Sequence, residues 1–125
     1  MSGIKFSVNG IPRPKQSFRY SKAGSYTDPK VKAWQDSVSW AAKEAMAGWE
    51  MMDGYLQATI TFYVPDHRRR DTDNMSKCVL DAMNKIVYND DTQVIDLHLH
   101  KRIDKDAPRI VVSVTQAKED IYDQI

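Results

Sequence analysis

The chain has 125 residues, a formal net charge of +1 and a single cysteine. This length fits one domain, residues 1–125, that buries a core without disulfides, and one cysteine excludes both an internal disulfide and a zinc site built from cysteines. No apolar run approaches the roughly 20 residues of a membrane span, and the amino terminus lacks a signal-peptide core. We therefore expect a cytoplasmic protein with no membrane partner.

The first elements along the chain are a strand and a basic loop. Ile4, Phe6 and Val8 alternate with polar residues, which predicts a strand. A long polar loop over residues 10–27 follows it. Up to residue 27 the chain carries five basic side chains and no acidic one: Lys5, Arg13, Lys15, Arg19 and Lys22. A positive field of this kind suits contact with phosphates.

A helix and a second strand come next. Asp28 followed by Pro29 is a typical helix start, because the carboxylate caps free amides and proline fits the first turn. Apolar residues then recur at helical spacing as far as Gly48. Residues 55–64 alternate between apolar and polar side chains, which predicts a strand that Pro65 ends.

The second half of the chain contains another helix and two more strands. A regular apolar stripe predicts a helix from Asn74 to about Val87, with Asp73 as its N-cap. Strands are expected over residues 95–102 and 110–114. Because only a short turn separates these two strands, we expect them to pair as a hairpin.

The order of these elements predicts the fold class. Amphipathic helices need a sheet face on which to bury their apolar stripes. We therefore expect a two-layer α+β fold, with a mixed sheet of about four strands and two main helices packed on one face.

The segment before the second helix combines basic and acidic groups. It reads Arg68-Arg69-Arg70-Asp71-Thr72-Asp73, Lys77 follows one helical turn later, and a second acidic pair, Asp90-Asp91, returns after the helix. Arginines suit the phosphate backbone, and clustered carboxylates suit a divalent cation that activates water. Alone, the arginines would be a solvated face and the acids a helix cap. Their coincidence favours phosphodiester hydrolysis.

This pattern also resembles a known family. The stretch from Pro65 to Asn74, followed by Lys77, Asp81-Ala82-Met83 and Asp90-Asp91-Thr92-Gln93-Val94, is similar to the RusA family of Holliday junction resolvases. The resemblance runs through most of the chain and is strongest from residue 65 to 96. Members of this family are small bacterial and prophage-borne endonucleases, so the resemblance implies a bacterial or phage-encoded protein.

The resemblance further implies a homodimer with a Mg²⁺-dependent site, for which Mn²⁺ is a possible substitute. By position, its three metal-binding and catalytic aspartates are Asp71, Asp73 and Asp91, and its supporting catalytic lysine is Lys77. Asp90 remains an alternative to Asp91, and the Gln93-Val94 that follows supports Asp91. We expect no nucleotide cofactor.

The geometry of the second helix limits how these aspartates can meet. A helix from Asn74 to Val87 is roughly 20 Å long, so its two ends cannot both contact one metal ion. Asp91 can join Asp71 and Asp73 only if the following strand runs back alongside the helix. The alternative is that a second subunit completes the site.

The residue pattern predicts a metal-dependent phosphodiester hydrolase. The resemblance implies, more narrowly, an endodeoxyribonuclease that resolves Holliday junctions by paired symmetric nicks in DNA recombination and repair. We expect DNA contacts from six basic residues: Arg68, Arg69, Arg70, Lys77, Lys15 and Arg19. One alternative is a non-catalytic junction or duplex DNA-binding protein, which would not need the carboxylates. Another is an enzyme acting on a small phosphorylated metabolite, which predicts a glycine-rich phosphate loop that the five scattered glycines do not form. Flap and fork substrates stay open beside the four-way junction.

Overall fold

Two helices and a four-stranded sheet make up the body of the molecule. The computed structural model describes residues 3–15, 19–21, 24–26 and 28–118. Along the chain these are β1 (Gly3–Asn9), β2 (Arg19–Ser21), β3 (Gly24–Tyr26), α1 (Pro29–Ala45), β4 (Leu56–Val64), α2 (Thr72–Met83), the 3-10 turn η1 (Asp91–Gln93), β5 (Val94–Ile103) and β6 (Arg109–Gln116).

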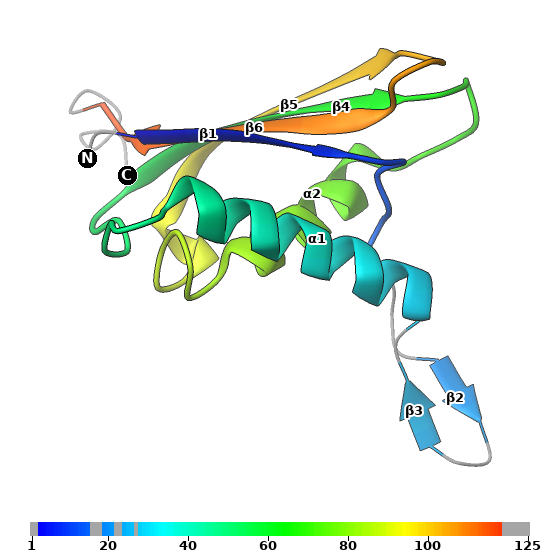
Figure 1. The fold of residues 1–125 in the computed structure, drawn as a ribbon, viewed down its shortest axis with the longest axis horizontal. Helices are drawn as coiled ribbons and strands as arrows, with labels where there is room; N and C mark the ends of the chain where they lie inside the picture. Colours follow the sequence, from blue (N-terminus) through cyan, green and yellow to red (C-terminus); the bar gives the residue numbers. More distant parts are fainter. Residues whose placement is uncertain (1–2, 16–18, 22–23, 27, 119–125) are drawn as a thin grey trace.

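The main sheet is mixed and lies over both helices. Its strand order is β1-β6-β4-β5. β6 pairs antiparallel with both β1 and β4, whereas β4 and β5 pair in parallel. Figure 1 shows α1 and α2 together on one side of the sheet. The predicted two-layer α+β architecture is therefore confirmed.

The core lies between the sheet and the helices because apolar residues alternate along the strands. In β4 every second side chain is buried, and Leu56, Ile60 and Phe62 are inaccessible to solvent. α1 and α2 contribute buried residues such as Val38 and Met75 from the other layer. Complete burial of such side chains is worth roughly 1.5–3 kcal/mol each, so this interface dominates the stability of the domain.

Helix α1 begins where the sequence predicts. The side chain of Asp28 accepts a hydrogen bond of 2.8 Å from the amide of Lys30, and Pro29 occupies the first turn. This cap satisfies an amide that has no partner within the helix. The helix extends to Ala45, somewhat short of Gly48.

The predicted hairpin between the last two strands is wrong. β4 lies between β5 and β6, so those two strands are not neighbours. β5 follows β4 through α2, and such a crossover returns the chain parallel to the strand that it left. The turn after β5 then crosses the end of β4, where the amide of Asp104 donates a 2.8 Å hydrogen bond to the carbonyl of Val64.

The basic loop predicted over residues 10–27 contains regular structure. β2 and β3 form a small antiparallel sheet of their own, in which Arg19 is opposite Tyr26. In Figure 1 this hairpin projects away from the body, below the start of α1. The sequence signal of alternating residues is too short here to predict strands of three residues.

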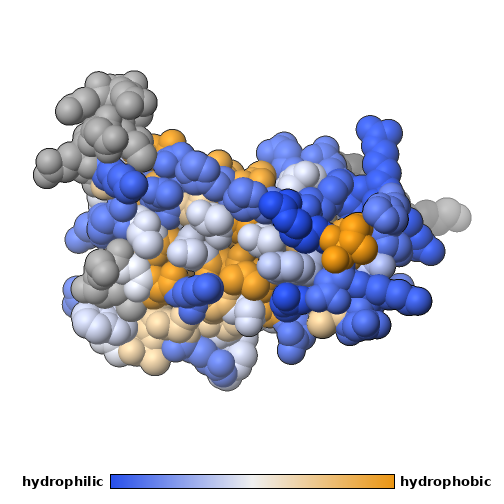
Figure 2. Space-filling view, turned by 90° about the horizontal axis from the view of Figure 1, so that it is seen from above, coloured by the Kyte–Doolittle hydropathy of each residue, from blue (hydrophilic) through white to orange (hydrophobic). Residues whose placement is uncertain are grey.

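The surface of the sheet opposite the helices is polar at its margins. Figure 2 views the molecule from above, and polar side chains surround an apolar area in the middle of this face. Along β4 the outward residues, Thr59 and Thr61 among them, are half-buried by their neighbours.

In the described part of the chain, no helix is long and apolar enough to cross a membrane.

Candidate active site

The first acidic residue of the predicted site begins helix α2. Asp71 has an extended backbone, and its Oδ1 accepts hydrogen bonds from the amides of Asp73 at 2.9 Å and Asn74 at 3.4 Å. The prediction that Asp73 is the N-cap is therefore wrong, and the helix starts two residues earlier than expected. Both carboxylates still lie at the amino end of α2, where the helix dipole favours negative charge.

Lys77 lies beside the second acidic residue. Its Nζ is 3.3 Å from Oδ2 of Asp73, one helical turn earlier. Both side chains remain more than half exposed, at 55% for Lys77 and 69% for Asp73. An exposed pair of this kind contributes little stability. Its significance is that an amine and a carboxylate are presented together to solvent.

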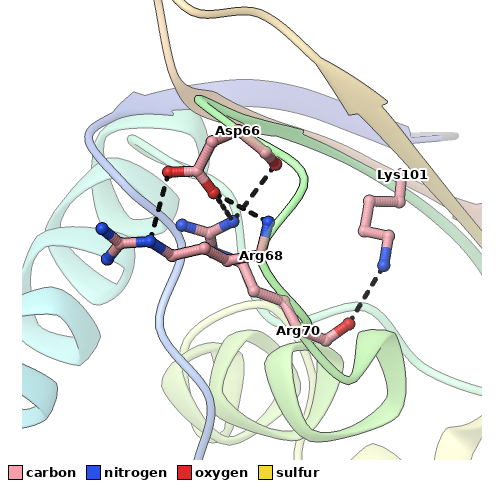
Figure 3. Close-up of polar contacts among 4 residues, drawn as sticks. All are labelled: Asp66, Arg68, Arg70 and Lys101. Carbon is pink, nitrogen blue, oxygen red and sulfur yellow. Dashed lines mark hydrogen bonds and ion pairs between the residues drawn. The ribbon is translucent and has the colours of Figure 1, made fainter.

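The three arginines before the acids differ in environment. The side chain of Arg68 is 84% exposed, and Arg69 is also exposed. The side chain of Arg70 is only 15% exposed, and its Nη1 is 2.7 Å from Oδ1 of Asp66 (Figure 3). The prediction that all three contact phosphates fits Arg68 and Arg69 better than Arg70.

The basic loop contacts the same helix. The amide of Lys15 donates a 3.0 Å hydrogen bond to the carbonyl of Asn74, and the Lys15 amine forms an ion pair with Asp81. The pKa of Lys15 is raised, chiefly by the hydrogen bond to Asp81. The side chain of Lys15 is 54% exposed, so its amine stays at the surface while it is paired with the carboxylate of Asp81. Arg19 lies in β2, and its side chain is outside the described part of the structure.

A hollow of about 450 Å³ opens where this loop meets the start of α2. It is lined by one residue of the basic loop, two of the three arginines, the N-cap aspartate and two residues of α2: Pro14, Arg69, Arg70, Asp71, Asn74 and Met75. The predicted acid–arginine segment thus borders a concave surface.

The second acidic pair lies beyond the other end of α2. The helix ends at Met83 instead of Val87, because the backbone of Asn84 leaves the helical region, with φ −58° and ψ 133°, and Lys85 has a positive φ of 65°. The amide of Asp91 donates a 3.0 Å hydrogen bond to Oδ1 of Asn84. Asp91 is therefore tied to the carboxyl end of the helix.

Asp90 and Asp91 occupy different environments. Oδ1 of Asp90 caps η1 by accepting the amide of Thr92 at 3.0 Å, and this hydrogen bond lowers the pKa of Asp90. The pKa of Asp91 is raised by burial and then by the nearby charges of Asp90 and Asp81. A carboxylate crowded by like charges gains most from a cation. The choice of Asp91 over Asp90 as the third ligand stays a prediction.

The side chain of Gln93, at the end of η1, ties the loop that carries Asp91 to the segment before β4. Its Oε1 accepts the amides of Asn89 at 2.9 Å and Asp90 at 3.1 Å, and its Nε2 donates to the carbonyls of Met52 and Gly54. The sequence marks this residue only as a neighbour of the acidic pair. Its structural role explains why a glutamine follows the two aspartates.

Strand β5 does run back alongside α2, as the three-aspartate hypothesis requires. It starts after η1, beside the end of the helix, and Lys101 near its far end contacts the carbonyl of Arg70. However, Asp91 precedes this strand. Among the residues that the structure describes, no three His, Cys, Asp or Glu side chains are grouped so that they could hold a metal ion. The three-aspartate site within one chain stays a prediction.

The main contacts that the sequence does not reveal connect residues far apart in the chain. Asp81 and Asn84 are visible as polar positions on α2, but their partners Lys15 and Asp91 are not. Lys101 gives no signal beyond its place in a strand.

Comparison with known proteins places these residues in a wider context. The family model for endodeoxyribonuclease RusA matches residues 9–115. The chain is 30% identical over 118 residues to the crossover junction endodeoxyribonuclease RusA of Aquifex aeolicus (strain VF5), covering 91% of this chain and 92% of that protein. The protein of the same name from Escherichia coli (strain K12) is 29% identical over 93% of this chain and 97% of its own length. A third relative, from Enterobacteria phage 82, is 28% identical over 84% of this chain and 88% of that protein.

Proposed function

Since this chain belongs to the RusA family of endodeoxyribonucleases, we propose that it cleaves Holliday junctions by paired symmetric nicks during DNA recombination and repair. The observation that supports this most is the start of α2. There, Asp71 and Asp73 lie beside Lys77 and follow two exposed arginines, Arg68 and Arg69. Negative groups for a cation and positive groups for phosphates are thus combined at the edge of one hollow.

A divalent cation fits the chemistry of these residues. Carboxylate oxygens are hard ligands that suit Mg²⁺, with Mn²⁺ as a substitute. We propose that Asp71, Asp73 and Asp91 hold the ion. When bound, the ion would supply a more acidic water molecule and neutralise charge on the phosphate.

The remaining residues would bind and orient the DNA. Arg68 and Arg69 are exposed, and Arg68 has only a long 3.7 Å ion pair with Asp66 to give up. Both would hold phosphates on either side of the scissile bond, which sets position without reading bases. The amine of Lys77 lies 3.3 Å from Asp73 and can stabilise negative charge that develops on the phosphate oxygens. Lys15 would reach DNA only by exchanging Asp81 for a phosphate.

A homodimer would suit both the substrate and the site. A four-way junction has near two-fold symmetry, and two matched nicks need two sites related by a two-fold axis. Because Asp71 caps one end of α2 and Asp91 is tied to the other, a second subunit that contributes a carboxylate would complete the metal site. Cleavage would then depend on dimerisation. We place this activity in the cytoplasm, where the DNA substrate lies.

One experiment separates this function from its main alternative. The purified protein would be incubated with a labelled four-way junction and with matched linear duplex, each with and without Mg²⁺. We expect symmetric nicks in the junction only when Mg²⁺ is added. Binding of the junction without nicking under every metal condition would favour a non-catalytic DNA-binding protein. Labelled flap and fork substrates would be tested in parallel, and cutting them as fast as the junction would widen the substrate class.

A further inference from the structure

Arg70 is held at its side chain by Asp66, in the loop after β4, and at its carbonyl by Lys101 of β5. Its Nη1 donates to Oδ1 of Asp66 at 2.7 Å and approaches the carbonyl of Asp66 at 3.3 Å. Its own carbonyl accepts a 3.1 Å hydrogen bond from Nζ of Lys101. Figure 3 shows Asp66 between Arg68 and Arg70, with Lys101 pointing at the Arg70 carbonyl from the opposite side.

These contacts close the loop that enters α2. Asp66 lies two residues beyond the end of β4, and Lys101 belongs to β5, the neighbouring strand. Asp66 also accepts the amide of Arg68 at 3.0 Å, which makes a local turn. Arg70 immediately precedes Asp71, so fixing the side chain and carbonyl of Arg70 restricts the direction in which the carboxylate of Asp71 points.

We propose that Asp66, Arg70 and Lys101, which we call the loop clamp, are positioning residues for the acidic pair Asp71 and Asp73. The guanidinium of Arg70 is used to hold the loop and not to hold DNA phosphate. This inference rests on the proposed metal-dependent cleavage. It adds that the affinity of the site for its cation depends on residues that never touch the cation or the DNA.

The contrast between Arg70 and Arg68 supports this assignment. A residue that binds phosphate is expected to be solvated in the free protein, as Arg68 is, with 84% of its side chain exposed and its Nε at a longer 3.7 Å from Oδ2 of Asp66. Arg70 has 15% exposed and already satisfies a carboxylate at short distance. Releasing it would leave Asp66 without its main partner beside incoming phosphates, which like-charge repulsion disfavours.

Lys101 offers the cleanest test because it is exposed and its amine contacts the backbone of the loop, not a side chain of the proposed site. Lys101→Met removes the donor but keeps the aliphatic chain, Lys101→Arg restores a donor, and Lys105→Met in the exposed β5–β6 turn is the matched control. The measurements are the Mg²⁺ concentration that gives half-maximal junction cleavage and the salt dependence of junction binding in Ca²⁺ or EDTA.

We expect Lys101→Met to raise the half-maximal Mg²⁺ concentration by about 10-fold, as is common when a group that orients a metal ligand is lost. Lys101→Arg should recover most of that change, and Lys105→Met should match the wild type. The salt slope of binding should stay the same in all of these variants, because no phosphate contact is removed.

A double-mutant cycle tests whether Arg70 acts through Asp66. Asp66→Ala and Arg70→Gln should each raise the half-maximal Mg²⁺ concentration. The double variant should need no more Mg²⁺ than the more impaired of the two single variants. Additive losses, or a salt slope that falls by about one phosphate contact in Arg70→Gln, would assign Arg70 to the DNA and overturn the proposal.

Amide hydrogen exchange separates this inference from the proposed function. In the absence of metal and DNA, Lys101→Met should speed exchange over residues 66–74 and leave β4 and β6 unchanged. If the wild type shows no metal-dependent cleavage but exchange responds in this way, the proposed function fails and the clamp stands as a structural device. If the wild type cleaves while Lys101→Met matches it in both exchange and Mg²⁺ requirement, the loop clamp is refuted.

Discussion

Replacing Asp71 by asparagine or by alanine should separate its two roles. Its Oδ1 accepts the amides of Asp73 and Asn74, and its negative charge is the proposed metal ligand. Asparagine caps helices about as well as aspartate, whereas alanine costs about 1 kcal/mol at an N-cap. Loss of charge at the helix start costs a further ~0.3–1 kcal/mol in either variant. Asp71→Asn should therefore be about 1 kcal/mol more stable than Asp71→Ala.

Urea unfolding and junction assays measure these two roles independently. With a urea m-value of about 2 kcal/mol/M, the midpoint of Asp71→Ala should lie roughly 0.5 M below that of Asp71→Asn. Both variants should lose cleavage by on the order of 100-fold or more yet still bind the junction, because the lost charge serves the metal and repels phosphate. Equal midpoints would refute the cap. Near wild-type cleavage by the folded Asp71→Asn protein would remove Asp71 from the metal site.

Four further predictions follow from the described contacts. Asp91→Asn should abolish cleavage while Asp90→Asn retains it, as measured on a labelled junction, and the reverse result would reassign the third ligand. The pKa of Asp91 is raised in the folded protein, so ionisation of this carboxyl group opposes folding. Asp91→Asn should therefore raise the melting temperature of the metal-free protein at neutral pH. This gain in stability should fade as the pH falls below the pKa that Asp91 has in the folded state. Arg68→Ala and Arg69→Ala should each flatten the salt dependence of junction binding by about 0.9 in the log–log slope, and unchanged slopes would make them solvated surface residues. Burial raises the pKa of the Cys78 thiol to about 11, so a disulfide reagent at pH 8 should modify Cys78 only after urea unfolds the chain.

The elements of this fold that depend on neighbouring residues were predictable. Asp28 and Pro29 mark the start of α1 because capping is a local effect. Alternation along β4 predicts a strand because the side-chain period of a strand is two. The cap of α2 was harder, since either aspartate of Asp71-Thr72-Asp73 has the right chemistry. The choice depends on which amides are left free, which periodicity cannot reveal.

Strand pairing and the surroundings of the site depend on residues far apart in the chain. The expected β5–β6 hairpin failed because a short turn is compatible with a hairpin and also with crossing the end of a third strand. Lys101 contacts Arg70 across 31 residues, and no local pattern encodes that contact. The sequence could therefore identify the acidic residues and the arginines, but not which arginine is already paired with a carboxylate in the folded protein.

The central place of β6 has a consequence for how the molecule is made. β6 pairs with β1, near the start of the chain, and with β4, and neither of those strands pairs with the other. During translation β1 must therefore wait until about residue 116 has left the ribosome before it gains its neighbour, and contacts that span so much sequence slow folding. At about 5–20 residues per second, that wait lasts several seconds. A chain interrupted before Arg109 would present two apolar strands without their shared partner, which makes incomplete synthesis products candidates for aggregation and for removal by proteases.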